Sequence, residues 1–455
     1  MRIWLVMVVA AIPTAGWSQV RQGEVGTEEQ PTVIEAHVIE ASPPTVRAEG
    51  DVVFEQGEGQ FRRRLRADQA IYNTQTAAGR MTSASFTTCD LPRPHYRIAA
   101  QEIRLSPDQR LKLRRVRIYL GRRCLISLPS LSINVGPGAL GEILLPRPGY
   151  SSRDGFFLTT RFALVDTDKT GVNLQLRPTT RRGVQGGVIG AYAIMGSARL
   201  ASAYVADSDM ELRRESPLPS LVEREVWTFP EPKPEPPLLS AFAALLVRER
   251  AFDIDVPNLL ATRLPEIGVR YISPQARVVR ENGQPRVGLQ VQGQTSWGRF
   301  TETPGGGYVS RWDTRGVVST TLAAFGRSTA LRGSVLARYS TYGGGNSYRV
   351  LGAALEVSRV FSGGSFASMR LIAHDISGST PLEFDDIDIR RELQAAGRCV
   401  LGRSTFAVLL DYDLDKQSLR DWQVSIGRRL HCLEPAIIWR HRFRQISFDL
   451  RVLGL

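Results

Sequence analysis

The sequence lacks the long apolar runs that membrane-spanning helices require. Its 455 residues are 42% hydrophobic and 23% charged, and after residue 20 the longest apolar run, Leu238–Val247, is already broken by Ser240. A spanning helix needs roughly 20 consecutive apolar residues. The sequence therefore excludes a polytopic helical transporter. It does not exclude a β-barrel, because the strands of a barrel alternate apolar and polar residues and are not detected by averaged hydropathy.

Cysteine and lysine are both scarce. The four cysteines, Cys89, Cys124, Cys399 and Cys432, show no C-x-x-C or other metal-ligand spacing, so we predict neither a metal nor a cofactor. Only four of the 58 basic residues are lysines, and the net charge is +13. Arginine binds phosphate and carboxylate groups in a bidentate way, so its excess suits an anionic partner. A genome that encodes arginine in place of lysine explains the same ratio without any ligand.

Sequence motifs for catalysis are also missing. No H-E-x-x-H, G-x-S-x-G or phosphate-binding loop occurs around the five histidines or elsewhere. His374 next to Asp375 could form a hydrolase site with a distant serine, as in outer-membrane lipases. Such a histidine in a strand is far more often a polar residue that faces a barrel lumen. We therefore expect that the protein is not an enzyme.

The first residues have the pattern of a secretory signal peptide. Arg2 precedes the apolar run Ile3–Ile12, Pro13 ends that run, and Gly16 and Ser18 are small residues that suit cleavage after Ser18. Residues 1–18 are therefore predicted to be removed on export, and residues 19–30 are predicted to form a flexible arm. Export makes two disulfides plausible and makes nucleic acid a poor partner.

A weak repeat follows over residues 31–145. Three similar phrases, Val33–Ile39, Leu65–Ile71 and Ile98–Ile103, place an alanine at positions 36, 67 and 100, so the phrase recurs at a nearly constant interval. Each unit reads as two short alternating strands around a glycine turn, and no unit alone can bury its apolar face. We expect residues 31–145 to form an all-β jelly roll or stack of rungs.

Acidic and basic residues are concentrated in different parts of this region of the sequence. Residues 19–59 hold two arginines against nine acids, whereas residues 60–125 hold fifteen basic residues against four acids. The pattern predicts a surface for a phosphorylated ligand, or equally a solvated strand face. The candidate residues of this basic surface are Arg62, Arg63, Arg64, Arg114, Arg115 and Arg117.

From about residue 155 to the end, segments of roughly ten residues alternate apolar and polar side chains, as in a transmembrane barrel. In the last segment, Ile446, Phe448, Leu450 and Val452 share one face, and aromatic residues recur near segment ends. The length of this region predicts about 16 antiparallel strands. We therefore assign residues 146–455 to an outer-membrane β-barrel. Residues 208–237, which end in a proline-rich run, cannot be a central strand and are predicted to be a long loop.

Several phrases around the domain junction resemble one family. They are Thr87-Thr-Cys89-Asp-Leu-Pro92, Tyr96-Arg-Ile-Ala-Ala100, Leu144-Leu-Pro146-Arg-Pro-Gly-Tyr150-Ser-Ser-Arg-Asp-Gly155 and Leu176-Arg-Pro178-Thr-Thr-Arg-Arg-Gly183. In this order they resemble the LPS-assembly outer-membrane proteins (LptD, formerly the organic-solvent-tolerance proteins). The region around Cys432 and the final strand also resembles the end of these proteins, so the similarity covers most of 31–200 and the C-terminal segment 431–455.

The resemblance implies a protein that inserts lipopolysaccharide, or a related glycolipid, into the outer leaflet of the outer membrane. It implies a periplasmic OstA-like β-domain that accepts lipid from a periplasmic bridge protein, with acyl chains near Ile39, Ile71 and Ile103. It also implies a barrel that opens sideways between its first and last strands, where Pro146, Pro148 and Pro178 would weaken strand pairing. Disulfides join domain and barrel in the family, which implies a bridge from Cys89 to Cys432 or Cys399; Cys124 has no counterpart.

The chain departs from the family in length. Typical members have far longer barrels that hold a plug lipoprotein, and a barrel of the predicted size argues against that partner and allows a smaller glycolipid. Two other functions stay open. A general porin would explain the barrel and its arginines but not the repeats in front, whereas a periplasmic scaffold would explain the repeats but not the aromatic residues at segment ends.

Overall fold

The structure is a computed structural model, and it is all-β. It describes residues 21–27, 30–56, 63–76, 78–87, 89, 91–106, 110–134, 147–167, 169–196, 211–212, 238–251, 259–274, 276–278, 287–323 and 329–452. The chain divides into two compact units, a sheet that is grouped with the turn Arg429–Pro435, and a barrel. The predicted signal peptide lies outside the described residues. Among them, no helix is long and apolar enough to cross a membrane.

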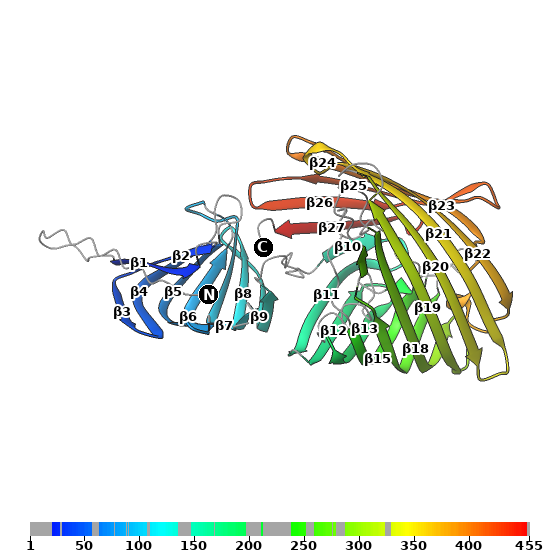
Figure 1. The fold of residues 1–455 in the computed structure, drawn as a ribbon, viewed down its shortest axis with the longest axis horizontal. Helices are drawn as coiled ribbons and strands as arrows, with labels where there is room; N and C mark the ends of the chain where they lie inside the picture. The colour runs from blue at the N-terminus through cyan, green and yellow to red at the C-terminus, as the bar shows by residue number, and fades with distance from the viewer. Residues whose placement is uncertain are drawn as a thin grey trace, which may run out of the picture. The chain divides into compact units, whose positions relative to one another are not determined.

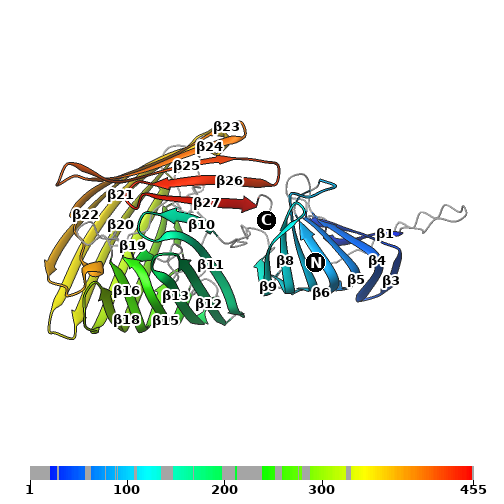
Figure 2. The same ribbon diagram turned by 180° about the vertical axis from the view of Figure 1, so that it is seen from behind.

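The first unit is built on one nine-stranded antiparallel sheet (Figures 1 and 2). Its strands follow the order of the chain, except that β3 pairs with β4 beside the path from β2 to β4. The strands are β1 (Arg21–Thr27), β2 (Gln30–Ala36), β3 (Val38–Ser42), β4 (Thr45–Gln56), β5 (Arg63–Asn73), β6 (Ala78–Thr87), β7 (Tyr96–Leu105), β8 (Arg110–Leu120) and β9 (Arg123–Asn134).

The expected repeat is visible as an irregularity in every second strand. Asp51 in β4, Ser83 in β6 and Arg115 in β8 all have positive φ angles, of 45°, 49° and 50°. They recur at an equal interval along the chain, so each β-hairpin is one repeat. A left-handed residue inside a strand interrupts the period-two alternation and kinks the strand. In β8 the buried residues on either side of the kink are Leu113 and Val116, which are three positions apart instead of two. The apolar face therefore stays continuous across the kink.

One face of this sheet is apolar and buried. It is made of the alternate residues of β4 to β8, and aligned alanines of the repeat phrases contribute to it, with Ala36, Ala67 and Ala100 exposed by only 1%, 5% and 6%. The rest of this core is Val46, Ala48, Val52, Phe54, Ala70, Met81, Ala84, Phe86, Ile98, Ile103, Leu111, Leu113, Val116 and Ile118.

The second unit is a closed antiparallel barrel of 16 strands, as the sequence predicts. Its strands are β10 (Arg147–Ser151), β11 (Gly155–Asp166), β12 (Thr170–Thr179), β13 (Gly183–Met195), β15 (Leu238–Ala251), β16 (Leu260–Ile272), β18 (Val287–Thr303), β19 (Val309–Ala323), β20 (Thr329–Tyr342), β21 (Ser347–Val360), β22 (Phe366–Gly378), β23 (Arg391–Leu401), β24 (Ser404–Asp413), β25 (Ser418–Arg428), β26 (Leu433–Arg440) and β27 (Gln445–Val452).

Four shorter elements accompany the barrel strands. β14 (Glu211–Leu212) pairs with the last residues of β15, and β17 (Ala276–Val278) pairs with the first residues of β18. η3 (Ser362–Gly364) and η4 (Glu383–Asp385) are single 3-10 turns. The predicted long loop 208–237 contains β14 as its only described part. The barrel closes where β27 meets β10, as both ribbon views show (Figures 1 and 2).

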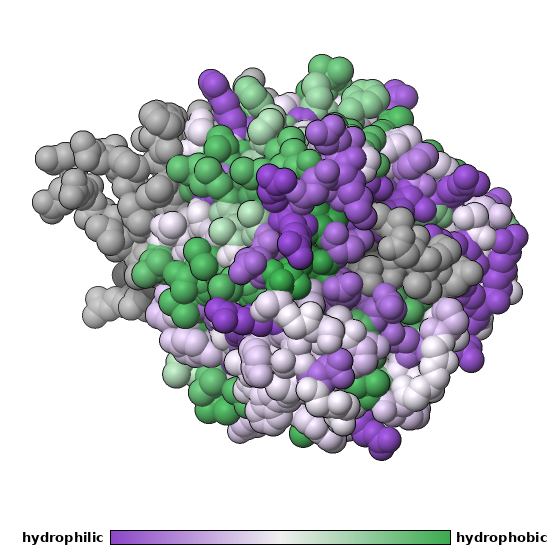
Figure 3. All heavy atoms as spheres, turned by 90° about the vertical axis from the view of Figure 1, so that its right-hand side faces the viewer, coloured by the Kyte–Doolittle hydropathy of each residue, from purple (hydrophilic) through white to green (hydrophobic). Residues whose placement is uncertain are grey.

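The barrel strands have an apolar outer face. In β21 every second residue is buried from Tyr348 to Ser358, and the residues between them are exposed and run from Arg349 through Leu351, Leu355 and Val357. The predicted alternation of the last strand is confirmed, since Ile446 and Phe448 are exposed and Asp449 is buried. Figure 3 shows hydrophobic patches beside clusters of hydrophilic side chains on the barrel side of the molecule.

Candidate functional site

The apolar face of the sheet is the first candidate surface, and two of the three predicted lipid-contacting residues lie on it. Ile103 is fully buried, and Ile39 is half-buried opposite Ala48 in the pairing of β3 with β4. Ile71 is 46% exposed and pairs with Arg47 and Arg80 on the opposite face. The predicted interior position of Ile71 is therefore wrong. In β5 the buried alanines 67 and 70 are three residues apart, and this phase shift turns Ile71 outward.

The predicted basic surface is present in part. Arg114, Arg115 and Arg117 are exposed on β8. Arg64 is half-buried and forms an ion pair of 2.5 Å with Glu55, so its charge is already matched within the sheet. The prediction for Arg62 lies outside the described residues, and of Arg63 the structure describes the backbone alone.

Glu102 gathers three arginines on this basic face. Its carboxylate lies 2.6 Å from Arg104, 2.7 Å from Arg80 and 3.6 Å from Arg114, which come from strands β7, β6 and β8. The hydrogen bond from Arg104 is the main cause that holds the pKa of Glu102 below its ordinary value, and the charges of the three arginines act in the same direction. One carboxylate thus faces three guanidinium groups, so this cluster keeps a net positive charge.

The seam between the first and last barrel strands is short. Among the described residues, β10 pairs with β27 over three positions, Gly149–Ser151 against Gln445–Ser447. By comparison, β18 and β19 pair over fourteen residues. The pairing stops at the residue after Pro148, and proline has no N–H to donate to a ladder. Few backbone hydrogen bonds therefore close the barrel at this point.

The three predicted gate prolines have different positions. Pro148 lies in β10, directly beside the seam. Pro178 lies in β12 and pairs with Val184 of β13, so it is two strands away from β10 and next to the turn that follows β12. The difference arises because β10 and β11 both precede β12, so Pro178 lies in the third barrel strand. The position of Pro146 lies outside the described residues.

Two contacts fasten the seam near the end where β10 stops. The Ser152 hydroxyl donates a hydrogen bond of 3.4 Å to the carbonyl oxygen of Phe443, in the turn between β26 and β27. The guanidinium of Arg153 lies 5.3 Å from the centre of the Phe443 ring. These side-chain contacts supplement the short ladder and connect the two strands that close the barrel.

Replacement of Gly149 is expected to weaken the seam. A Cβ atom at this residue would lie 2.3 Å from Cζ of Phe157 and 2.9 Å from the carbonyl oxygen of Ile446 in β27. Gly149→Val should therefore cost about 1–3 kcal/mol by overpacking and force β10 and β27 apart. The measurement is a series of samples heated to increasing temperatures before a gel is run. It gives the temperature at which the folded barrel changes to the mobility of the unfolded chain. Gly316→Val in β19 is the control, since its Cβ would meet no atom closer than 4.0 Å. An equal shift in both variants would contradict the expectation.

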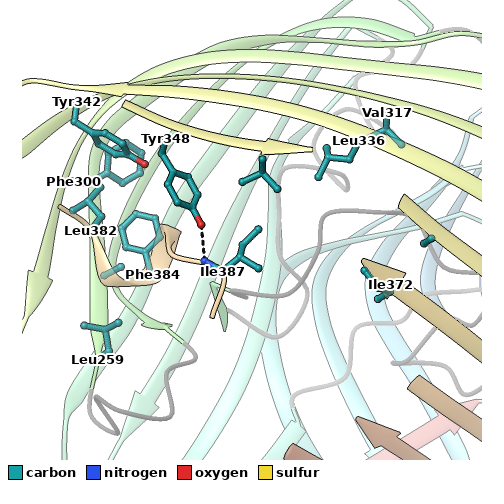
Figure 4. Close-up of a cluster of buried hydrophobic side chains, with 13 residues drawn as sticks. Leu259, Phe300, Val317, Leu336, Tyr342, Tyr348, Ile372, Leu382, Phe384 and Ile387 are labelled. Atoms are coloured by element: carbon teal, nitrogen blue, oxygen red, sulfur yellow. Dashed lines mark hydrogen bonds between the residues drawn. The ribbon is translucent and has the colours of Figure 1, made fainter. Parts of the chain in front are cut away.

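A loop between β22 and β23 folds into the barrel. Leu382, Phe384 and Ile387 of this loop are buried among inward-facing residues of strands β18 to β22. Phe384 lies 5.6 Å from the ring of Phe300, and the Tyr348 hydroxyl accepts a hydrogen bond from the Ile387 N–H (Figure 4). The carboxylate of Glu302 accepts the N–H groups of Glu383 and Phe384. This segment, residues 379–390, is called the inner loop below.

A ladder of ion pairs attaches the inner loop to the barrel wall. Asp385 forms ion pairs of 2.6 Å with Arg311 of β19 and Arg338 of β20, and Tyr342 donates a hydrogen bond to it. The ladder continues along the wall through Asp313, Glu266, Arg263 and Glu249. Every member is buried or nearly so, and buried charges persist in proteins when they are paired in this way.

The structure brings two of the four cysteines together. Cys89 and Cys432 are buried and lie in one cluster with His95 and His431, and the four ligand atoms are all within 4.8 Å of one another. No disulfide joins any of the four cysteines. Burial, and then the neighbouring Cys89, raises the pKa of the Cys432 thiol to about 12. Cys124 and Cys399 are exposed on β9 and β23, outside this cluster.

Two features of the site were not anticipated from the sequence. The inner loop could have been suspected from its alternation of apolar and acidic residues, Leu382-Glu-Phe-Asp-Asp-Ile-Asp388. The Cys–His cluster has a fainter signal, because each buried cysteine has a histidine close by along the chain while Cys124 and Cys399 have none. The two halves of the cluster come from opposite ends of the chain, so no local spacing reveals it.

Comparison with known proteins finds solved structures of low similarity. No protein-family signature and no curated protein sequence match the chain. CdiB from Acinetobacter baumannii is similar with a TM-score of 0.38 and 7% identity over 68% of this chain and 58% of that one, so this chain spans less than two thirds of its length. The P pilus usher (PapC) translocation pore is similar with a TM-score of 0.16 and 11% identity, over 95% and 93% of the two chains.

Proposed function

We propose that this protein is an outer-membrane barrel that inserts lipopolysaccharide, or a related glycolipid, into the outer leaflet through the seam between β10 and β27. The observation that carries the proposal is the three-residue pairing of these strands, compared with five residues between β25 and β26 and fourteen between β18 and β19. A seam with few ladder hydrogen bonds needs little free energy to open compared with a longer strand pair. Because the proposal involves only transfer, it requires no catalytic residue.

The outer surface of the barrel supports a membrane location. Large apolar side chains are exposed on strands all around it, among them Phe156 at 68%, Val335 at 61% and Leu355 at 52%. Many large apolar side chains exposed in this way are costly in water and are ordinarily covered by lipid or by another protein. The predicted signal peptide supports export to the outer membrane, with the sheet in the periplasm.

The sheet supports the choice of a lipid as cargo. Its continuous apolar face, which includes Ile103, suits acyl chains, whereas its other face carries the arginines around Glu102. Acyl chains match the first property, and the proposal assigns the lipid to the apolar face alone. In the proposal, the lipid reaches the sheet from a periplasmic bridge protein that supplies it.

The inner loop bears on the question of a plug lipoprotein. It places Phe384 and Asp385 inside the barrel and holds them there with ion pairs. A loop that lies in the lumen takes space that a plug lipoprotein would need, so we propose that the chain acts without such a partner.

The test is photocrosslinking in cells at two isoleucines of opposite orientation. A photoreactive residue at 103, on the apolar face, should form an adduct with lipid A or the corresponding glycolipid while export is active. The same residue at 71, on the exposed face, is the matched control and should form none. Absence of an adduct at 103 in correctly assembled protein, or equal adducts at both positions, would overturn the proposed path.

A further inference from the structure

The cluster of Cys89, His95, His431 and Cys432 has the composition of a structural metal site. Two thiol sulfurs and two imidazole nitrogens converge, and all four ligand atoms are within 4.8 Å of one another. Zinc sites of the structural kind use four such ligands in a tetrahedron. All four residues belong to the first unit of the fold, in which the turn between β25 and β26 is grouped with the sheet.

The separations between ligand atoms suit a zinc ion at the centre. His95 Nδ1 lies 3.4 Å from the sulfur of Cys432 and 3.8 Å from that of Cys89, and His431 Nδ1 lies 3.7 Å from the Cys89 sulfur. With bonds of about 2.3 Å to sulfur and about 2.0 Å to nitrogen, a tetrahedral zinc site has edges of about 3.3–3.8 Å. Small shifts of side chains would complete the site.

The loop that carries the first two ligands is held at both ends. The Thr87 hydroxyl accepts the N–H of Cys89 and donates to the carbonyl oxygen of Tyr96, which closes the base of the loop between β6 and β7. The carbonyl oxygen of His95 accepts the N–H of Gly121 at 2.7 Å. Proline residues at 92 and 94 restrict the backbone between the two ligands. Cys89 and His95 are therefore presented together without a large loss of entropy.

The turn that carries the other two ligands adopts a costly backbone geometry. Leu430 and Leu433 bond to each other through both backbone groups, so His431 and Cys432 are the two central residues of a tight hairpin turn. His431 has a φ of +59°, in the left-handed region. Glycine ordinarily occupies such a position, and a side chain retained there often has a functional reason. Here the strained backbone aims the imidazole at the Cys89 sulfur.

We propose that these four side chains bind one Zn²⁺ ion and that this ion fastens the β25–β26 turn to the β6–β7 loop. On binding, the two thiols release their protons to solvent, and two thiolates with one Zn²⁺ form a site of zero net charge. Cys89 and Cys432 are only 0% and 5% exposed, so this neutrality matters in their buried environment. The proposal replaces the disulfide that the family resemblance implied, which joins Cys89 to Cys432 or Cys399.

The test uses the full-length chain in detergent, purified without chelators and shown to be folded by its mobility on an unboiled gel. Elemental analysis should find one zinc per chain. Replacement of zinc by Co²⁺ should give the intense visible absorption of a tetrahedral site and the charge-transfer bands of thiolate ligands. Cys89 and Cys432 should resist alkylation until the metal is removed with a chelator.

Single variants separate a metal site from a disulfide. His95→Ala and His431→Ala should each reduce bound zinc from one per chain to near background, although neither change removes a cysteine. Cys124→Ser and His37→Ala, which alter residues outside the cluster, should retain a full complement. A wild-type protein without zinc or cobalt absorption, in which peptide mapping finds a Cys89–Cys432 disulfide, would overturn the proposal. Because metal content is the readout, this result is independent of the lipid-transport proposal.

Discussion

Locking the seam with an engineered disulfide is expected to abolish delivery of glycolipid to the cell surface. Tyr150 of β10 and Ile446 of β27 are directly opposite in the pairing and are both exposed on the outer face. Cysteines at these two positions can form a covalent bond across the three-residue seam without a change inside the lumen. If the lipid leaves between these strands, the oxidised variant should leave glycolipid undelivered, and a reductant should restore delivery. The measurement is labelling of newly exported glycolipid on intact cells.

A second disulfide in the same barrel is the control for this experiment. Thr295 of β18 and Thr314 of β19 are also paired opposite each other, with their hydroxyl oxygens 3.0 Å apart. A bond there lies within a pairing of fourteen residues, which the proposed route does not require to open. Normal delivery in this control and loss in the seam variant is the expected pair of results. Normal delivery in both oxidised variants would show that the seam stays closed during transport.

Releasing the inner loop is expected to increase the conductance of the barrel. Asp385 is paired with both Arg311 and Arg338, so Asp385→Ala leaves two buried guanidinium groups without this partner. Removal of one partner from a buried pair costs about 3–5 kcal/mol. The loop should then leave the wall, and single-channel recordings in planar bilayers should show frequent, long openings that the wild-type protein lacks.

A conservative change separates the loop from the general stability of the barrel. Asp415 forms an exposed ion pair with Arg391 away from the inner loop, and exposed pairs contribute less than about 1 kcal/mol. Asp415→Ala should therefore leave both the conductance and the heat resistance of the barrel unchanged. Steady conductance in the wild-type protein, with no increase in Asp385→Ala, would favour a porin and contradict the role given to the inner loop.

Much of the fold follows from local sequence patterns. Alternation predicts the barrel strands because each strand separates a lipid-like face from an interior, as in the last strand, where Phe448 is exposed and Asp449 is buried. The repeated phrases predict a stacked sheet for the same physical reason. What alternation cannot supply is a phase change. Ile71 occupies the expected position in its phrase, but the shift between Ala67 and Ala70 places it on the opposite face.

The site is harder to predict because its parts meet through the fold rather than along the chain. Pro148 could be assigned to the seam because it lies near the start of the first strand, whereas Pro178 lies in the third barrel strand, which the proline pattern alone does not reveal. No local sequence motif contains both His95 and His431. They lie close together because the β25–β26 turn is part of the same compact unit as the sheet. The ion pairs of Asp385 depend on a loop that folds inward, and a charge pattern alone does not specify its direction.

The proposed route takes a glycolipid from the apolar face of the sheet to the seam. The most direct measurement of this route combines the photoreactive residue at 103 with cysteines in place of Tyr150 and Ile446 in one protein. The oxidised protein should accumulate lipid adducts at 103 while no lipid reaches the surface, and reduction should lower the adducts and restore delivery. Unchanged adducts and undiminished surface delivery in the oxidised protein would show that the lipid takes another route.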